Sequence, residues 1–251
     1  MEANAIRRPK LSDVLRIGRP IVRGSPGTMP NLNVFSRPMP RRPMMFALLA
    51  TALAGFVDAV GYAQLNRLYV SFMSGNSTHL GMVLASGQWG EAVSAGSVIL
   101  AFVTGSFMGT LLSDAVDKPL LALISSEMLF CAIAAGMAAI GFGMCSMTVV
   151  AAIMGIQNVM HQSIANTDVG KGFITGALFG LGQAAAHAIR DRANLASASV
   201  NACSWLSFVG GVVCGAHSVG SLGVALSLGV VCFGFLVMIA LVFQTAFDKQ
   251  S

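Results

Sequence analysis

Residues 44–63 read MMFALLATALAGFVDAVGYA, an almost uninterrupted apolar run with one ionisable side chain, Asp58. An α-helix needs about 20 such residues to cross the ~30 Å hydrocarbon core of a bilayer. The whole chain of 251 residues follows the same pattern, because 55% of its residues are hydrophobic and only 10% are charged. These values exclude an ordinary soluble globular domain and indicate an all-α membrane protein.

The positive charge of the chain is concentrated before this run. Residues 1–43 contain nine Lys or Arg, two acidic residues and seven of the eight prolines, so the basic character belongs to this segment and predicts no nucleic-acid partner. Such a composition is typical of a disordered tail; the alternative is a start codon assigned too early, with a later methionine as the true start. Arg37, Arg41 and Arg42 directly precede the first apolar run. By the positive-inside rule they predict a cytoplasmic N-terminus.

The rest of the chain, residues 44–247, divides into eight apolar segments joined by short connections that leave no room for a soluble domain. We place these segments at 44–63, 72–88, 92–113, 119–141, 145–163, 172–189, 201–219 and 222–246. The predicted fold is a polytopic helical bundle with about six to eight membrane segments. The number depends on whether the two shortest segments, 72–88 and 172–189, cross the bilayer or are broken, re-entrant elements.

These segments contain an internal repeat of roughly 100 residues. Gly55-Phe-Val-Asp58 aligns with Gly155-Ile-Gln-Asn158, Phe72-Met-Ser-Gly75 with Phe173-Ile-Thr-Gly176, and Phe102-Val-Thr-Gly105 with Phe208-Val-Gly-Gly211. We therefore predict a single transmembrane domain made of two repeats, at about 44–118 and 145–220, with linking helices 119–141 and 222–246. Four crossing helices in each half would make the halves parallel, and three would make them inverted. The distribution of Lys and Arg does not choose between the two.

Polar side chains in the middle of membrane segments are functional candidates, because an ionised group there costs about 2.5–3.5 kcal/mol on insertion scales. Two acids meet this criterion, Asp58 in the first segment and Glu127 in the fourth. Asn158 is the repeat-related partner of Asp58, and its polar run also contains Gln157 and His161. We predict that Asp58 and Asn158 face each other between the halves, where duplicated transporters bind substrates. The alternative is that Asp58 only bonds to neighbouring backbone or serines.

The stretch SFMSGNSTH at residues 71–79 is unusually polar for the start of a membrane segment. The candidates for substrate or ion binding in this stretch and in its counterpart in the second repeat are Ser74, Gly75, Asn76, Thr78, His79, Thr175 and Gly176. A half-helix that begins here would direct its positive end toward an anion or a carboxylate. The structural alternative is a helix N-terminus with tightly packed small residues.

The motifs Gly55-Phe-Val-Asp58, Phe72-Met-Ser-Gly75-Asn76 and Phe173-Ile-Thr-Gly176 resemble the pattern of the YoaK-like family of bacterial membrane proteins, the domain of unknown function 1275. The resemblance covers approximately residues 44–247. It implies a multi-spanning protein of the bacterial inner membrane without an assigned activity. The Arg- and Pro-rich tail departs from the family's pattern, and function has to be argued from the residues themselves.

The predicted function is that of a secondary transporter or permease for a small molecule or ion. Asp58, Asn76, Asn158 and His161 would line a site near the midplane, with Asp58 as the protonatable or cation-binding group. One alternative is a non-transporting scaffold or sensor, and a second is an intramembrane serine hydrolase, which is disfavoured because no nucleophile motif is complete. We expect the bilayer and a solute as partners, and a homo-oligomer is compatible with the sequence. We expect no catalytic residue, cofactor or metal site.

Overall fold

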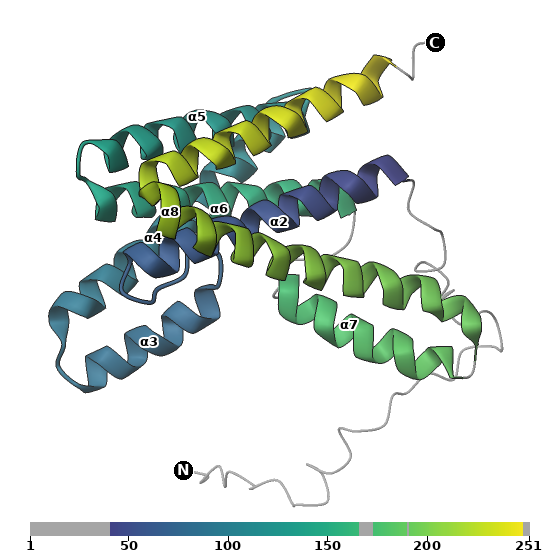
Figure 1. The fold of residues 1–251 in the computed structure, drawn as a ribbon, viewed down its shortest axis with the longest axis horizontal. Helices are drawn as coiled ribbons and strands as arrows, with labels where there is room; N and C mark the ends of the chain where they lie inside the picture. Colours follow the sequence, from purple (N-terminus) through teal and green to yellow (C-terminus); the bar gives the residue numbers. More distant parts are fainter. Residues whose placement is uncertain (1–40, 166–172, 190, 248–251) are drawn as a thin grey trace, which may run out of the picture. The chain divides into compact units, whose positions relative to one another are not determined.

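The computed structural model of the chain describes residues 41–165, 173–189 and 191–247, with their side chains except those of 41–43, 161–165, 173, 193 and 245–247. The described part contains α-helices, one short 3-10 helix and no strand. In chain order these are α2 (Arg41–Gln64), α3 (Met73–Ala85), α4 (Trp89–Ala115), α5 (Pro119–Ala139), α6 (Gly143–Ala165), α7 (Phe173–Ala188), η3 (Arg192–Asn194) and α8 (Leu195–Phe247) (Figure 1). Five of them are long and apolar enough to cross a membrane. The predicted class, an all-α polytopic membrane protein, is confirmed.

Helix α8 consists of two helices joined without a loop. Its 53 residues would extend ~80 Å as a straight helix, far more than the ~30 Å core of a bilayer. The backbone breaks at Gly223, where φ is 78° and ψ is 174°, a conformation essentially restricted to glycine. The ribbon of α8 changes direction part-way along its length (Figure 1). The two parts, residues 195–222 and 224–247, correspond to the two segments that the sequence predicts there.

Helices α4 and α6 run in the same direction and touch through glycines. A Cβ at Gly105 would collide with the carbonyl oxygen of Ala152, and a Cβ at Gly109 would lie 3.1 Å from the Cα of Ile156. Along this contact, the later residue of α4 lies against the later residue of α6, so the two helices run in the same direction. Such close approach between backbones replaces the hydrophobic driving force that is missing between helices in lipid.

Helix α2 and the first part of α8 are packed in the same manner. A Cβ at Gly211 would collide with the carbonyl oxygen of Ala52, and a Cβ at Gly215 with that of Phe56. Here too the later residue of one helix lies against the later residue of the other, so α2 and the first part of α8 run in the same direction. At both helix pairs the carbonyl groups of one helix fill the space over the glycines of the other.

Helices α2 and α6 run in opposite directions. The side-chain amide of Gln157, near the end of α6, donates to the carbonyl oxygen of Ala50, near the start of α2, at 3.3 Å. At the other end, a Cβ at Gly143 would press against the side chain of Gln64. Because α4 shares the direction of α6, α4 is opposite to α2. The connection that contains α3 therefore leaves α2 and enters α4 at the same side.

The two short helices, α3 and α7, have 13 and 16 residues. Their lengths of ~20 and ~24 Å fall short of the ~30 Å core of a bilayer. Helix α3 packs beside α4, and α7 packs beside the first part of α8 (Figure 1). Each is thus a short helix paired with the long helix that follows it.

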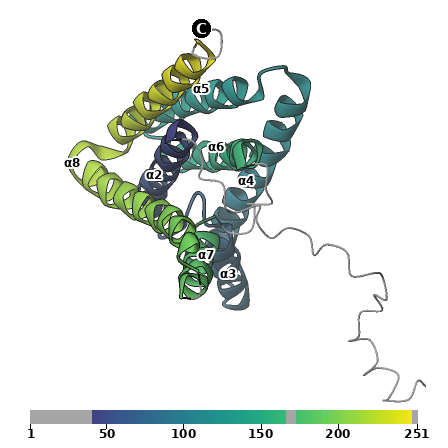
Figure 2. The same cartoon turned by 90° about the vertical axis from the view of Figure 1, so that its right-hand side faces the viewer.

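Helix α5 packs against α6 and against α8. Figure 2 shows the second part of α8 lying along α5. These three helices contribute most of the large, fully buried side chains, which are Leu123, Ile124, Met147, Met154, Met160, Leu228, Phe235 and Met238. The thiol of Cys131 on α5 also bonds to the carbonyl oxygen of Leu228 on α8, at 3.5 Å.

Candidate functional site

The connection between α2 and α3 returns into the protein as non-helical backbone. It turns at Asn66 and Arg67, which have positive φ angles of 49° and 71°. Leu68 and Val70 follow, and their side chains are buried. Irregular backbone at membrane depth is tolerated only where it is enclosed by protein or lines a cavity, because its N–H and C=O groups find no partner in lipid.

The carboxylate of Asp58 accepts hydrogen bonds from part of this non-helical backbone. Its Oδ1 accepts from the backbone N–H of Val70 at 2.9 Å and from that of Ser71 at 2.7 Å. Its Oδ2 accepts from the hydroxyl of Ser71 at 2.5 Å. Asp58 is buried within α2, so these contacts hold the returning segment against the side of that helix.

The side chain of Asn76 binds the same segment from α3. Its Oδ1 accepts from the backbone N–H of Tyr69 at 2.9 Å, and its Nδ2 donates to the carbonyl oxygen of Tyr69 at 2.6 Å. Asn76 is completely buried. We call Asp58, Asn76 and the backbone of residues 69–71 the loop clamp.

Two glycines make room for the loop clamp. A Cβ at Gly61 would lie 2.6 Å from Cγ1 of Val70, and one at Gly75 would lie 2.5 Å from Cδ1 of Phe72. Both distances are well inside van der Waals contact. The two sequence motifs of this region, one on α2 and one at the start of α3, therefore build a single local structure.

A cavity of about 420 Å³ opens between α2, the first part of α8 and the loop clamp. Its lining consists of Asp58, Ala59, Tyr62, Ala63, Tyr69, Phe208, Val212, Ala216 and Val219. Asp58 is the one charged residue among these, and the rings of Tyr62 and Tyr69 pack with their centroids 5.2 Å apart. The volume lies in the ~300–1,000 Å³ range of small-molecule sites.

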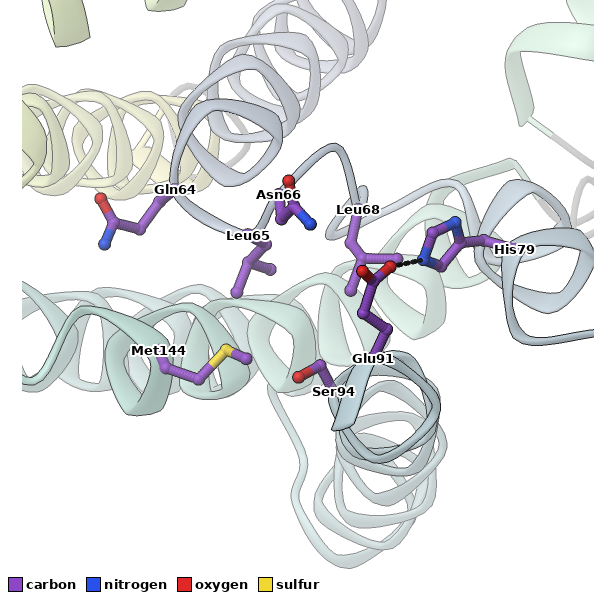
Figure 3. Close-up of a pocket in the computed structure, with 8 residues that line it drawn as sticks. All are labelled: Gln64, Leu65, Asn66, Leu68, His79, Glu91, Ser94 and Met144. Carbon is purple, nitrogen blue, oxygen red and sulfur yellow. Dashed lines mark ion pairs between the residues drawn. The ribbon is translucent and has the colours of Figure 1, made fainter. Parts of the chain in front are cut away.

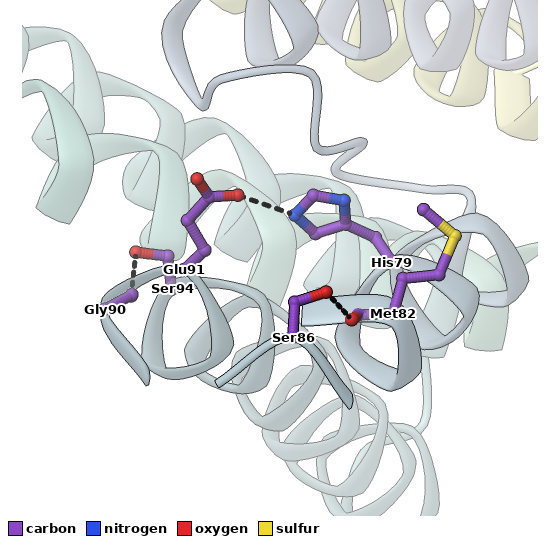
Figure 4. Close-up of polar contacts among 6 residues, drawn as sticks. All are labelled: His79, Met82, Ser86, Gly90, Glu91 and Ser94. Carbon is purple, nitrogen blue, oxygen red and sulfur yellow. Dashed lines mark hydrogen bonds and ion pairs between the residues drawn. The ribbon is translucent and has the colours of Figure 1, made fainter. Parts of the chain in front are cut away.

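A second, smaller cavity of about 170 Å³ lies beside His79 and Glu91 (Figure 3). The Nε2 atom of His79 is 3.4 Å from Oε2 of Glu91, and both side chains are partly exposed, at 30% and 44%. This ion pair joins α3 to the start of α4. The neighbouring hydroxyls of Ser86 and Ser94 donate to carbonyl groups of their own helices, as Figure 4 shows.

The polar residues of α6 do not join Asp58 in its cavity. The amide of Gln157 reaches α2 at Ala50, and the half-buried Asn158 donates to the carbonyl oxygen of Met154 in its own helix at 2.8 Å. Neither residue lines the cavity beside Asp58. The side chain of His161 lies outside the described side chains.

Most of the other sequence candidates lie on the two short helices, whereas Glu127 lies on α5. Ser74 and Thr78 are exposed on α3, where the hydroxyl of Thr78 donates to the carbonyl oxygen of Ser74 at 3.0 Å. Thr175 and Gly176 are exposed on α7. Of the predicted residues whose side chains are described, the structure thus brings together Asp58 and Asn76, with Gly75 packed beside them, and places the others elsewhere.

Sequence reasoning missed three participants. Ser71 supplies both a backbone and a side-chain donor to Asp58, and Tyr62 and Tyr69 line the cavity. Their positions in the sequence could have indicated these roles. Ser71 is the first residue of the polar stretch, and both tyrosines lie close to the motifs.

Asp58 and Asn76 of the loop clamp, and Gly75 beside it, are also residues on which the family resemblance rests. A family model described as "Protein of unknown function (DUF1275)" matches residues 46–242. The chain belongs to the DUF1275 family. No curated protein and no solved structure matches it. The matched range begins in α2 and ends in α8, so it includes the loop clamp and the cavity of this DUF1275 protein.

Proposed function

We propose that this DUF1275 protein is a secondary permease for a small solute, which binds in the cavity beside Asp58. The observation that carries the proposal is a cavity of about 420 Å³ whose lining includes a carboxylate buried in a membrane-spanning helix. Ionisable groups inside membrane segments usually face a substrate or ion pathway, because burying them elsewhere is costly.

The lining of the cavity favours a cationic solute with apolar parts. Asp58 supplies a negative charge, and the lining residues include no Lys or Arg that would neutralise it. Tyr62 and Tyr69 offer aromatic faces, which attract cations with about 0.5–2 kcal/mol. Alanine, valine and phenylalanine make up the remaining wall.

The directions of the helices support a transporter built from two inverted repeats. The first helices of the two predicted repeats, α2 and α6, run in opposite directions. The glycines that touch α6 from α4 are Gly105 and Gly109, and their sequence counterparts Gly211 and Gly215 touch α2 from α8. Each half also contains one unusually short helix, a feature that points to binding sites in transporters of this architecture.

The proposed location is the inner membrane of a bacterium, with the N-terminus in the cytoplasm. Arg37, Arg41 and Arg42 precede the first membrane helix, and positive residues next to a first membrane helix tend to stay in the cytoplasm. The cavity and the loop clamp lie toward the end of α2, so they would be nearer the outer face.

Uptake of quaternary ammonium ions tests the permease. The full chain is reconstituted into liposomes, and radiolabelled tetramethyl-, tetraethyl- and tetrabutylammonium serve as singly charged probes of graded size. Asp58→Asn keeps the oxygen that accepts from the N–H groups of Val70 and Ser71, and it removes the charge. We expect saturable uptake by the natural chain and a fall of roughly tenfold or more in this variant.

Ser71→Ala is the matched control. It removes the hydroxyl that bonds to Oδ2 of Asp58 and leaves the charge in place, so uptake should stay close to that of the natural chain. Absence of uptake for every probe, or equal uptake by Asp58→Asn, would contradict the proposal.

A scaffold or sensor is the second candidate, and the loop clamp favours it. Asp58 and Asn76 already use their polar atoms to hold backbone groups, which is what a purely structural role requires. In that case Asp58→Asn lowers the thermal stability and no flux is found. A hydrolase is not proposed, because the imidazole of His79 pairs with Glu91 and the hydroxyl of Ser77 donates to Met73 in its own helix.

A further inference from the structure

Glu127 stands apart from the other buried polar residues of the described part of the chain. These residues are Thr51, Asp58, Asn76, Glu127, Ser146, Gln157, Ser218 and Ser227. Seven of them make hydrogen bonds, for example Ser146 to the carbonyl oxygen of Ala134 at 2.7 Å and Ser218 with Ser227 at 2.9 Å. Both carboxyl oxygens of Glu127 lack a hydrogen-bond partner, and the residue is 0% exposed.

The surroundings of Glu127 on its own helix are apolar. Leu123 and Ile124, one turn earlier on α5, are 0% exposed, and Cys131, one turn later, is 1% exposed. Helix α5 packs against α4, α6 and α8. No basic residue is buried in the described part of the chain, so no described cation compensates the carboxyl group.

The neighbouring helices contain few groups that could titrate with Glu127. Neither α6 nor α8 contains an Asp, Glu, Lys or Arg, and the acids of α4, Glu91 and Asp114, lie near its two ends. The titratable group that interacts with Glu127 is the thiol of Cys131, which shares a hydrogen bond with the thiol of Cys232 on α8. Both cysteines are free. The remaining described titratable residues of α6 and α8, which are Cys145, Cys203, Cys214 and His217, are exposed.

An ionised carboxylate in such a place would be far more expensive than the neutral acid, because nothing replaces its hydration. A metal ion does not supply the missing partner, since no group of three His, Cys, Asp or Glu that could hold one occurs among the described residues. We propose that Glu127 is a proton-binding site of the membrane domain, separate from the cavity beside Asp58, and that it carries its proton in the conformation described here.

This proton site has a mechanical consequence. Glu127 has no contact with water in the packed arrangement, so the proton can leave only when α5 separates from its neighbours or water enters between them. Proton release is thereby tied to a rearrangement around α5, as coupling in a proton-driven membrane protein requires. The inference does not depend on the identity of a solute and can be tested without one.

Infrared spectroscopy with isotope labelling detects directly whether a glutamate side chain is protonated. The chain contains only three glutamates, Glu2, Glu91 and Glu127. Spectra are recorded on the natural full chain in lipid bilayers at neutral pH, once unlabelled and once with glutamate carrying ¹³C in its side-chain carboxyl. We expect the C=O stretching band of a carboxylic acid without a hydrogen-bond partner, which shifts to lower frequency on labelling.

Variants assign the band. Glu127→Gln has nearly the same shape and should lose the band completely, whereas Glu91→Gln and Asp58→Asn should keep it. A labelled natural chain that shows no carboxylic acid band at neutral pH would overturn the proposal, as would a band that persists in Glu127→Gln. The isotope shift is measured in the natural chain, so it shows whether a glutamate carries a proton even if one of the variants fails to fold.

Discussion

Asn76 uses its whole side-chain amide to complete the backbone of one distant residue, Tyr69. The Oδ1 atom accepts from the Tyr69 N–H at 2.9 Å, and the Nδ2 atom donates to the Tyr69 carbonyl at 2.6 Å. This reciprocal pair substitutes for the hydrogen bonds that a helix or strand would provide. It allows a non-helical segment to lie between α2 and α3 inside a membrane protein.

Asn76→Ala should therefore destabilise the protein by roughly 1–3 kcal/mol, the cost of leaving buried backbone groups unsatisfied. Asn76→Asp keeps the acceptor but loses the donor, so it should destabilise at least as much. Thermal unfolding of the purified chain in detergent measures both effects. Ser77→Ala is the control, because its exposed hydroxyl bonds within α3 and the change should stay within about 0.5 kcal/mol. Equal midpoints for Asn76→Ala and Ser77→Ala would argue against the clamp.

The positions of the helices could be predicted because a bilayer sets the length and the composition of a membrane-spanning helix. The segment predicted at 119–141 is observed as Pro119–Ala139, with proline in its first turn. The segments predicted at 201–219 and 222–246 are the two parts of α8, which meet at Gly223. Here apolar length was sufficient to predict two helices, and the break lies at Gly223, within the second predicted segment.

The role of Asp58 could not be read from its own helix. Its partners lie on a segment 12 and 13 residues later, and no periodicity predicts where non-helical backbone turns back. Asn158 was predicted to face Asp58, yet its amide donates to the carbonyl oxygen of Met154, one turn earlier in α6. Side-chain rotamers and loop paths decided these contacts, and the apolar pattern of the sequence contains neither.

Adjacent glycines on α8 provide a matched test of helix packing. A Cβ at Gly211 would collide with the backbone of α2 at Ala52, whereas nothing lies within 4 Å of a Cβ at Gly210. Gly211→Ala should cost about 1–3 kcal/mol through overpacking. Gly210→Ala should be neutral or slightly stabilising, because alanine favours a helix by about 1 kcal/mol over glycine. Denaturation of both variants under identical conditions makes the comparison, and a Gly211→Ala variant as stable as Gly210→Ala would contradict the packing described.

The ion pair between His79 and Glu91 should contribute little. Its distance is 3.4 Å and its side chains are partly exposed, and pairs of this kind are worth about 0–1 kcal/mol. Glu91→Gln should therefore change the unfolding midpoint only slightly and should leave uptake of the ammonium probes intact. A large loss of uptake in this variant would move the solute path from the cavity beside Asp58 to the smaller cavity beside Glu91.

The opposite directions of α2 and α4 predict where the loops lie in the membrane. Because α3 is too short to cross, Gln88 should lie on the side opposite the N-terminus, and Asp117, after α4, should lie on the same side as the N-terminus. Both residues are exposed. Single cysteines at these positions are introduced into a chain whose five native cysteines are replaced by alanine, and an impermeant maleimide is applied to intact and to permeabilised cells.

With a cytoplasmic N-terminus, Gln88→Cys should label in intact cells and Asp117→Cys only after permeabilisation. A full crossing by α3 would invert both results, because it adds one passage before α4. The two positions therefore check each other: labelling of both from outside fits neither arrangement and would show that the cells leak. The inverted result would require α2 and α4 to point the same way, which the contacts of Gln157 with Ala50 and of Gly105 with Ala152 do not allow.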